Sequence, residues 1–256
     1  MKQTLTIVAL SALFVGALFA ADTMKSSWTD GLSVQSSVGF ESEYVFRGRN
    51  IAHNVAVWTL DGSYKLYKGT LYSGVKSLNG QNTTYTENDF YVGYKLPVYE
   101  KFSADFGGTY YWYTNGAPAI DRTFELYAGL IYSGLYVNPA VYVYYDFALE
   151  RWVGELSGKY SWDLAKYGCA NTSFDVGAFL GVLSSRDTNS DQVAGNAKNS
   201  YMYYGASADL VYSFNKTASA SVGIRYVGND DDAATGGALF DRENSFFWGT
   251  KFSAGF

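Results

Sequence analysis

The sequence predicts an all-β protein, a transmembrane antiparallel up-and-down β-barrel of about 12 strands. Segments in which apolar and polar residues alternate recur about every 20 residues along the chain. Aromatic residues make up 18% of the chain and charged residues only 17%, whereas soluble domains contain about 25% charged residues. The last segment, Glu243–Phe256, alternates up to the final residue, so that Phe256 completes its apolar face.

The N-terminus predicts export from the cytoplasm. Lys2 precedes an apolar run from Ile7 to Phe19, and small residues follow that run, which is the pattern of a cleaved secretory signal peptide. A membrane anchor is the alternative, but a run of about 13 apolar residues is too short to span a bilayer comfortably. We expect residues 1–20 to be the signal peptide and residues 21–256 to form the barrel, with the exact cleavage site open.

Twelve segments carry the alternation and are predicted to be strands. In the first, a slip of one residue would place Glu41, Glu43 and Arg47 among apolar groups, so the register is strongly specified. The third segment alternates poorly, and Pro139 fits only the entrance of the seventh because proline donates no ladder hydrogen bond. In order, the segments are Ser33–Gly48, Val55–Leu66, Gly69–Leu78, Glu87–Leu96, Lys101–Tyr113, Arg122–Tyr132, Asn138–Phe147, Glu150–Trp162, Thr172–Leu183, Ser200–Tyr212, Thr217–Val227 and Glu243–Phe256.

Most of these segments have one apolar and one polar face. The apolar face of the first is predicted to contain Val34, Val38, Phe40, Tyr44 and Phe46. Later apolar faces are marked by large side chains, which include, in chain order, Trp58, Phe90, Phe106, Phe124, Trp152, Phe174, Met202, Ile224 and Trp248.

The connections alternate between tight turns and long loops, as in outer-membrane barrels. Tight turns include Leu66–Gly69 and Ser213–Lys216, and long loops include Ser184–Asn199 and Gly228–Arg242. The fit is imperfect: Arg49–Asn54 and Ala148–Leu149 are short for predicted outer loops, and Asp163–Asn171 is long for a turn on the opposite side. An even count of 12 is expected, and counts of 10 or 14 stay open.

The apolar faces are predicted to point outward into lipid. A soluble sandwich would bury them instead, and periodicity alone does not separate the two arrangements. Three features favour the barrel: strands of about 10–13 residues exceed the usual length in globular sheets, Trp and Tyr lie near strand ends as in interfacial girdles, and the last residue keeps the strand register. A closed barrel pairs its last strand with its first, so Glu243–Phe256 is interpreted as the closing strand.

The first segment resembles a known family. The stretch GFESEYVFRGRNIAHNVAV, Gly39–Val57, is similar to the TorF-type porin family of Gram-negative outer membranes, whose pattern Ser-x-Tyr-Val-Phe-Arg-Gly is matched from Ser42 to Gly48. The fragments Phe124–Tyr132 and Val141–Phe147 are similar as well. This chain has Arg-Asn-Ile after the motif, where Ile-Ser-Gln is expected. The resemblance implies a barrel with a pore, and it supplies no substrate and no catalytic residues.

Charged residues on the polar faces are predicted to line the lumen, where they would set ion selectivity. The alternative is that these charges pair across a filled interior, because 12 strands lie between the filled 8-strand barrels and the open 16-strand porins. The excess of acidic residues suggests a mild cation preference. The predicted lumen residues are Glu41, Glu43, Arg47, Asp105, Glu125, Arg151, Glu155, Asp175, Asp209 and Arg225.

Two other functions remain open. His53, the only histidine, would serve a lipid-modifying barrel enzyme that pairs it with a serine, although no spacing marks a nucleophile and no catalytic residue is assigned. The acidic loop Gly228–Asn244 would serve an adhesion or structural barrel, or would bind a divalent cation. One His and one Cys make a transition-metal site improbable, and no cofactor is expected.

These observations predict a porin-like channel in the outer membrane of a Gram-negative bacterium, through which ions or small polar solutes diffuse passively. Outer-membrane lipid and lipopolysaccharide are the expected surroundings, and the barrel-assembly machinery is expected to recognise the strand that ends at Phe256. A net charge of −5 argues against nucleic acid as a partner.

Overall fold

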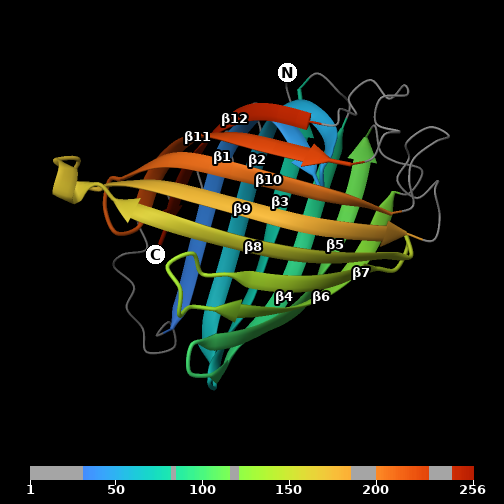
Figure 1. Ribbon diagram of the computed structural model, residues 1–256, viewed down its shortest axis with the longest axis horizontal. Helices are drawn as coiled ribbons and strands as arrows, with labels where there is room; N and C mark the ends of the chain where they lie inside the picture. Colours follow the sequence, from blue (N-terminus) through green and yellow to red (C-terminus); the bar gives the residue numbers. More distant parts are fainter. Residues whose placement is uncertain (1–30, 82–84, 116–120, 186–199, 231–243) are drawn as a thin grey trace.

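Twelve antiparallel strands close into a single barrel within the part of the chain that the computed structural model describes, residues 31–81, 85–115, 121–185, 200–230 and 244–256 (Figure 1). Each strand pairs with its neighbours in the sequence, and β1 pairs with β12. The strands are β1 Leu32–Phe46, β2 Arg49–Leu66, β3 Gly69–Gly80, β4 Thr86–Tyr99, β5 Phe102–Asn115, β6 Arg122–Tyr132, β7 Ala140–Asp146, β8 Arg151–Asp163, β9 Thr172–Ser185, β10 Ser200–Ser213, β11 Ala218–Asn229 and β12 Asn244–Gly255.

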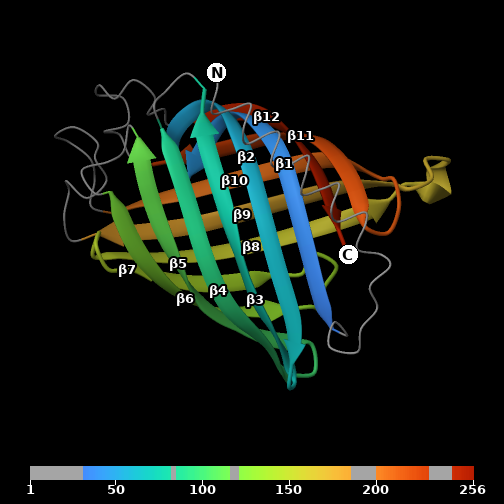
Figure 2. The ribbon, with the colours of Figure 1, turned by 180° about the vertical axis from the view of Figure 1, so that it is seen from behind.

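The predicted fold class and strand count are therefore confirmed, and the two views in Figures 1 and 2 show the wall from opposite sides. The weakly alternating segment Gly69–Leu78 is a regular strand that pairs with both neighbours. Among the described residues, no helix is long and apolar enough to cross a membrane. The predicted signal peptide, residues 1–20, and most of the acidic loop Gly228–Asn244 lie outside the described residues.

Large apolar side chains cover the outside of the barrel. Every strand from β2 to β12 contributes at least one that is exposed, and examples in strand order are Tyr64, Leu71, Phe90, Phe106, Leu126, Val141, Trp152, Leu180, Met202, Ile224 and Trp248. Glu125 and Asp105, one residue away from outward-facing neighbours on their strands, are instead buried inside. A charge at the bilayer midplane costs about 2–4 kcal/mol on the lipid face of such a barrel, so this distribution fits hydrocarbon outside and polar groups within.

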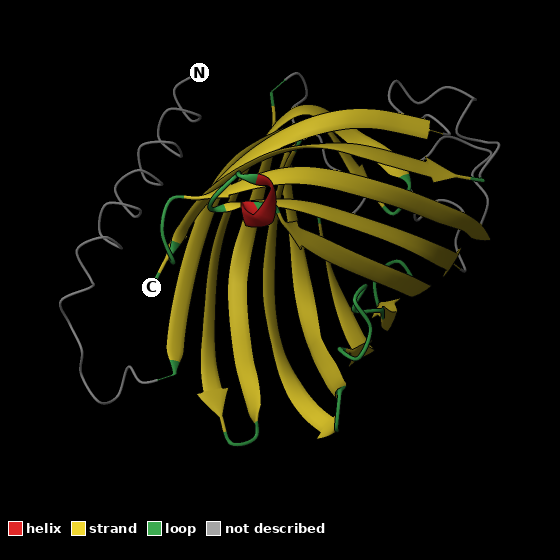
Figure 3. Ribbon diagram, turned by 60° about the vertical axis from the view of Figure 1, so that its left-hand side comes forward, coloured by secondary structure: helices red, strands yellow, loops and turns green. Residues whose placement is uncertain are grey.

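Short turns connect the strands at one end of the barrel. The turn between β8 and β9, which the sequence marks as unusually long, contains the short 3₁₀ helix η3, Ala165–Tyr167 (Figure 3). This helix ends at Gly168, whose φ of 89° lies in the left-handed region that glycine adopts without steric cost. The Asp163 carboxylate accepts a hydrogen bond from the Ala165 N–H at 2.9 Å and so stabilises the turn that leads into the helix.

The barrel closes between β1 and β12. Residues Gln35–Glu41 pair with residues 249–255 in antiparallel register. Beyond these pairs, Val34 and Phe256 exchange two backbone hydrogen bonds, N to O at 3.1 and 3.0 Å. The last residue of the chain is thus part of the closure, as the alternation of the final segment predicts.

The outer end of β1 and β2 leaves the wall and folds into the lumen. The pairing of β1 with β12 ends at Glu41, and the pairing of β2 with β3 begins only at Val55. We call the intervening residues, 42–54, the inward hairpin. At its two ends, Ser42 Oγ accepts the backbone N–H of Trp248 at 3.0 Å, and the Asn54 carbonyl accepts that of Gln81 at 2.9 Å. These bonds satisfy backbone groups of the wall where its partner strand departs.

The inward hairpin corrects the prediction that Arg49–Asn54 forms an outer loop. This segment is strand in β2, and the turn lies earlier, at Arg47 and Gly48, whose φ values of 49° and 83° are both positive. A two-residue turn with two positive φ values matches the twist of a β-hairpin. Asn54 also has a positive φ, 51°, at the point where β2 leaves the wall.

The closure predicts a sharp effect of adding one methyl group at Gly39. A Cβ there would lie 2.6 Å from the Thr250 carbonyl oxygen of β12, so Gly39→Ala forces β1 away from β12. We expect a loss of about 1–3 kcal/mol in stability, measured as a lower midpoint of heat-induced unfolding on semi-native gels. The matched control is Gly62→Ala in β2, where the new Cβ would come no closer than 3.9 Å to the Ser73 carbonyl oxygen, an ordinary van der Waals contact. Equal midpoints for the two variants would contradict this account of the closure.

Candidate functional site

The tip of the inward hairpin is fixed by an ion pair across the lumen. Arg47 Nη2 lies 2.7 Å from Glu125 Oε2 of β6. In the closed barrel, β6 is separated from β1 by several strands in either direction. The Glu125 residue is 1% exposed, and its second carboxylate oxygen accepts a hydrogen bond from the Tyr111 hydroxyl at 3.2 Å. The guanidinium also lies over the rings of Phe46 and Tyr144, 4.7 and 5.1 Å from their centroids. Arg47 is therefore held by both charge and aromatic faces.

Wall residues of β10 and β11 satisfy the backbone of the turn. The Tyr201 hydroxyl donates to the Arg47 carbonyl at 3.1 Å, and the Asn229 side-chain amide donates to the Gly48 carbonyl at 2.7 Å. Arg49 donates through Nε to the same Tyr201 oxygen at 3.2 Å. Because buried carbonyl groups need partners, these bonds specify where the tip lies.

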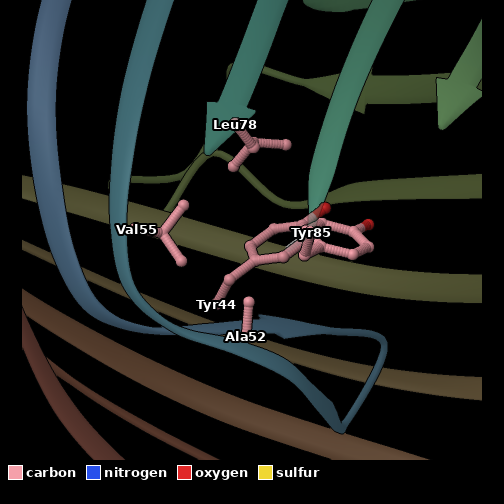
Figure 4. Packing of buried hydrophobic residues seen from close by; sticks show 5 residues of the cluster. All are labelled: Tyr44, Ala52, Val55, Leu78 and Tyr85. Carbon is pink, nitrogen blue, oxygen red and sulfur yellow. The ribbon is translucent and has the colours of Figure 1, made fainter. Parts of the chain in front are cut away.

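The base of the hairpin packs against β3 and the start of β4. Tyr44 and Ala52 of the hairpin and Val55 of β2 contact Leu78 and Tyr85, and all five are buried (Figure 4). The Tyr44 hydroxyl also donates to Glu87 Oε1 at 3.3 Å. The prediction that Tyr44 and Phe46 continue the outward apolar face of β1 is therefore wrong. The alternation is maintained, but the strand that carries it has turned into the barrel.

A cavity of about 440 Å³ lies inside the barrel beside the hairpin tip. We call it the tyrosine chamber. Phe46 and Arg47 of the hairpin form part of its lining, and the strands supply the rest. Its principal polar residues are Tyr72, Asp105, Glu125, Tyr127, Tyr142, Tyr144, Glu155 and Tyr203.

The phenol groups of the chamber orient its carboxylates. The Asp105 carboxylate accepts one hydrogen bond on each oxygen, from Tyr72 at 2.7 Å and from Tyr142 at 2.8 Å. The hydroxyls of Tyr72 and Tyr127 lie 2.6 Å apart, and since Tyr72 donates to Asp105, Tyr127 donates to Tyr72. The Tyr203 hydroxyl donates to Glu155 Oε2 at 2.8 Å. Three carboxylates and one guanidinium therefore share the chamber, which leaves an excess of two negative charges.

The structure divides the predicted lumen residues among several places. Arg47, Asp105, Glu125 and Glu155 line the tyrosine chamber. A second group contains Arg225, whose Nη2 lies 2.8 Å from Asp209 Oδ1 and 3.8 Å from Glu41 Oε1.

The other three predicted residues lie apart from these two groups. Glu43 is on the hairpin and accepts a hydrogen bond from the Asn50 amide at 2.6 Å. Arg151 pairs in register with Asp146 in the β7–β8 ladder. Asp175 accepts a hydrogen bond from the Ser161 hydroxyl at 2.5 Å.

The inward tyrosines are not among the predicted lumen residues. Tyr72 lies in a segment that alternates too poorly for its faces to be assigned, and Tyr127, Tyr142 and Tyr144 contribute to the prediction only through the aromatic content. A signal exists in the alternation, since Tyr127 falls in phase with Glu125, and Tyr142 with Asp146. An aromatic residue in phase with charged residues on a barrel strand points inward.

His53 lies on the inward hairpin rather than on the lipid-facing surface. It pairs with Glu43 in the β1–β2 ladder, and its Nδ1 lies 3.8 Å from Glu43 Oε1. A histidine that acts on membrane lipid at the interface needs access to the outside of the wall. The position of His53 does not favour the lipid-modifying alternative. Within the described residues, no three His, Cys, Asp or Glu side chains are arranged to hold a metal ion.

Comparisons with known proteins relate this chain to barrels by structure alone. No protein-family model and no curated protein matches the sequence. A KdgM porin in complex with disordered oligogalacturonate aligns with a TM-score of 0.52 and 10% identity, over 88% of this chain and 99% of that one. LpxR from Salmonella typhimurium aligns with a TM-score of 0.52 and 9% identity, over 87% and 99%. OprD from Pseudomonas aeruginosa reaches 0.41 and 13%, over 90% and 68%.

At these identities the likeness to the KdgM porin and LpxR concerns the fold. A closed, even-stranded barrel with an apolar outer belt is the architecture of bacterial outer-membrane proteins, and the protein resides in the outer membrane of a Gram-negative bacterium. The resemblance to the TorF-type family stays a prediction.

Proposed function

We propose that this protein is a porin-like channel for small polar solutes and ions, with the inward hairpin at its narrowest part. The observation that carries the proposal is the tyrosine chamber, a polar cavity inside a barrel whose outer face is apolar. A barrel that served only as a structural element would gain nothing from desolvating these carboxylates. The fold shared with the KdgM porin supports a pore as well.

The hairpin decides how wide the pore is. Twelve strands enclose a lumen between the filled interior of 8-strand barrels and the open channel of 16-strand porins. In this barrel the hairpin crosses that lumen from β1 and β2 to Glu125 of β6. The proposed conductance is therefore small, and solutes pass the chamber beside the Arg47 side chain.

The excess of carboxylates in the chamber predicts a preference for cations. Fixed charges in a narrow, low-dielectric lumen concentrate ions of opposite sign. Purified barrel in a planar bilayer should give discrete current steps, and a potassium chloride gradient should displace the reversal potential toward that of potassium. Asp105→Asn/Glu155→Gln removes two of the three carboxylates and is expected to reduce this displacement by about half or more.

The matched control removes two charges outside the chamber. Glu100→Gln/Asp163→Asn changes two exposed residues, one in the turn after β4 and one at the end of β8, and its reversal potential should equal that of the unmodified protein. Absence of current steps from correctly folded barrel would overturn the channel. An unchanged reversal potential in Asp105→Asn/Glu155→Gln would instead overturn the assignment of selectivity to the chamber.

A further inference from the structure

We infer that the tyrosine chamber is a binding site for a small organic cation that carries a guanidinium or primary ammonium group. This inference rests on the proposed channel only in that a solute must reach the lumen. It adds to the channel a saturable site with a stated chemical class of ligand. The argument has three parts: a guanidinium already bound there, acceptors that remain, and aromatic faces that surround them.

The chain's own Arg47 shows how the chamber holds a cation. Its guanidinium contacts the Glu125 carboxylate at 2.7 Å and lies over the ring of Tyr144 at 5.1 Å. A carboxylate combined with an aromatic face stabilises a guanidinium by charge, hydrogen bonding and cation–π attraction together. The part of the chamber around Glu125 is thus already a guanidinium site, and a side chain of the protein itself occupies it.

The part of the chamber around Asp105 and Glu155 has the same combination of carboxylates and aromatic rings. No side-chain cation among the described residues pairs with these two carboxylates. Asp105 accepts one phenol hydrogen bond on each oxygen, and since a carboxylate oxygen has two lone pairs, each retains one acceptor position. Glu155 accepts from Tyr203 through Oε2, which leaves its other oxygen available. Among the described residues, no ion pair is formed by Asp105 or Glu155.

Aromatic faces surround these acceptors. Tyr127, Tyr142 and Tyr144 form a cluster in which the ring centroid of Tyr127 lies 6.3 and 6.0 Å from those of Tyr142 and Tyr144, and the latter two lie 5.8 Å apart. The phenol groups of Tyr72 and Tyr142 are committed to Asp105, so their orientation is fixed before any ligand enters. Such preorganisation lowers the entropic cost of binding.

Size and charge define the ligand class. A cavity of about 440 Å³ accommodates a molecule the size of an amino acid or a diamine. Its excess of negative charge disfavours carboxylate ligands, and the many rings disfavour a fully hydrated metal ion. A flexible cation with one or two nitrogen groups satisfies both Asp105 and Glu155.

The test is isothermal titration calorimetry of the purified full-length mature barrel in detergent at low ionic strength, with agmatine as the probe. We expect saturable binding of agmatine and none of the dianion succinate. Asp105→Asn/Glu155→Gln should weaken agmatine binding on the order of tenfold or more, while Glu100→Gln/Asp163→Asn should bind as the unmodified protein does. Tyr142→Phe keeps the ring and should bind agmatine more tightly than Tyr142→Leu.

The outcomes separate this inference from the proposed channel. Cation-selective current without agmatine binding overturns the site and leaves the channel standing. Agmatine binding without current overturns the channel and leaves the site. Equal loss of binding in both double variants would show attraction to overall charge only and would overturn the site. Heat modifiability on semi-native gels confirms that each variant is folded before titration.

Discussion

Removal of the inward hairpin is expected to raise the single-channel conductance several-fold. The variant replaces Glu43–His53 with Asn-Gly, a pair that forms the two-residue turn of a β-hairpin, so that Ser42 and Asn54 are joined at the level of the wall. The physical reason is that a lumen enclosed by 12 strands is no longer crossed by the tip at Arg47. Planar-bilayer recording of the refolded variant measures the change.

One control and one point variant accompany this deletion. The Lys68→Ala variant alters the short turn between β2 and β3 at the other end of the barrel and should conduct as the unmodified protein does. The point substitution Gly48→Ala should act in the same direction as the deletion, because a Cβ there would meet the Tyr203 Cβ at 2.7 Å and the φ of 83° is unfavourable for alanine. A deletion variant that folds and conducts no more than the original would show that the hairpin is not the constriction.

Glu125→Gln is expected to release the hairpin tip without deleting it. The Arg47 and Glu125 side chains are 9% and 2% exposed, and breaking a buried ion pair by removing one partner costs about 3–5 kcal/mol. Because each 1.4 kcal/mol corresponds to a factor of ten, the equilibrium between docked and undocked tips should shift by about a hundredfold or more. Hydrogen exchange of the amides of residues 45–50 should accelerate accordingly.

The double variant Arg47→Ala/Glu125→Ala separates loss of the pair from loss of one charge. With both partners gone, no uncompensated charge remains buried, so this variant should be closer to the original than Glu125→Gln is. If the amides of residues 45–50 exchange as slowly in Glu125→Gln as in the unmodified protein, the ion pair does not hold the tip in place.

The architecture could be predicted because a barrel imposes its physics on every strand. Phe106 and Trp152 must face lipid and Asp105 must not, so the alternation is visible wherever a strand crosses the membrane. Even the weak segment Gly69–Leu78 is fixed by its place between two well-specified neighbours, since an antiparallel wall does not skip a strand.

The inward hairpin could not be predicted in the same way. Tyr44 and Phe46 keep the alternation of β1, and a period of two gives the same pattern whether a strand stays in the wall or bends into the lumen. The decision is made by contacts distant in sequence, such as Arg47 with Glu125 and Asn229 with the Gly48 carbonyl. The chamber escaped prediction for a related reason, because its tyrosines come from several strands and only closure brings them together.

Strand β1 takes part both in the closure of the barrel and in the inward hairpin. Residues Gln35–Glu41 of β1 pair with β12, and the inward hairpin begins at the next residue, Ser42. The contacts that hold the hairpin tip come from Glu125 of β6, Tyr201 of β10 and Asn229 of β11, which all follow the hairpin in the chain. The hairpin that is synthesised first is therefore fixed in place only by strands that are synthesised later.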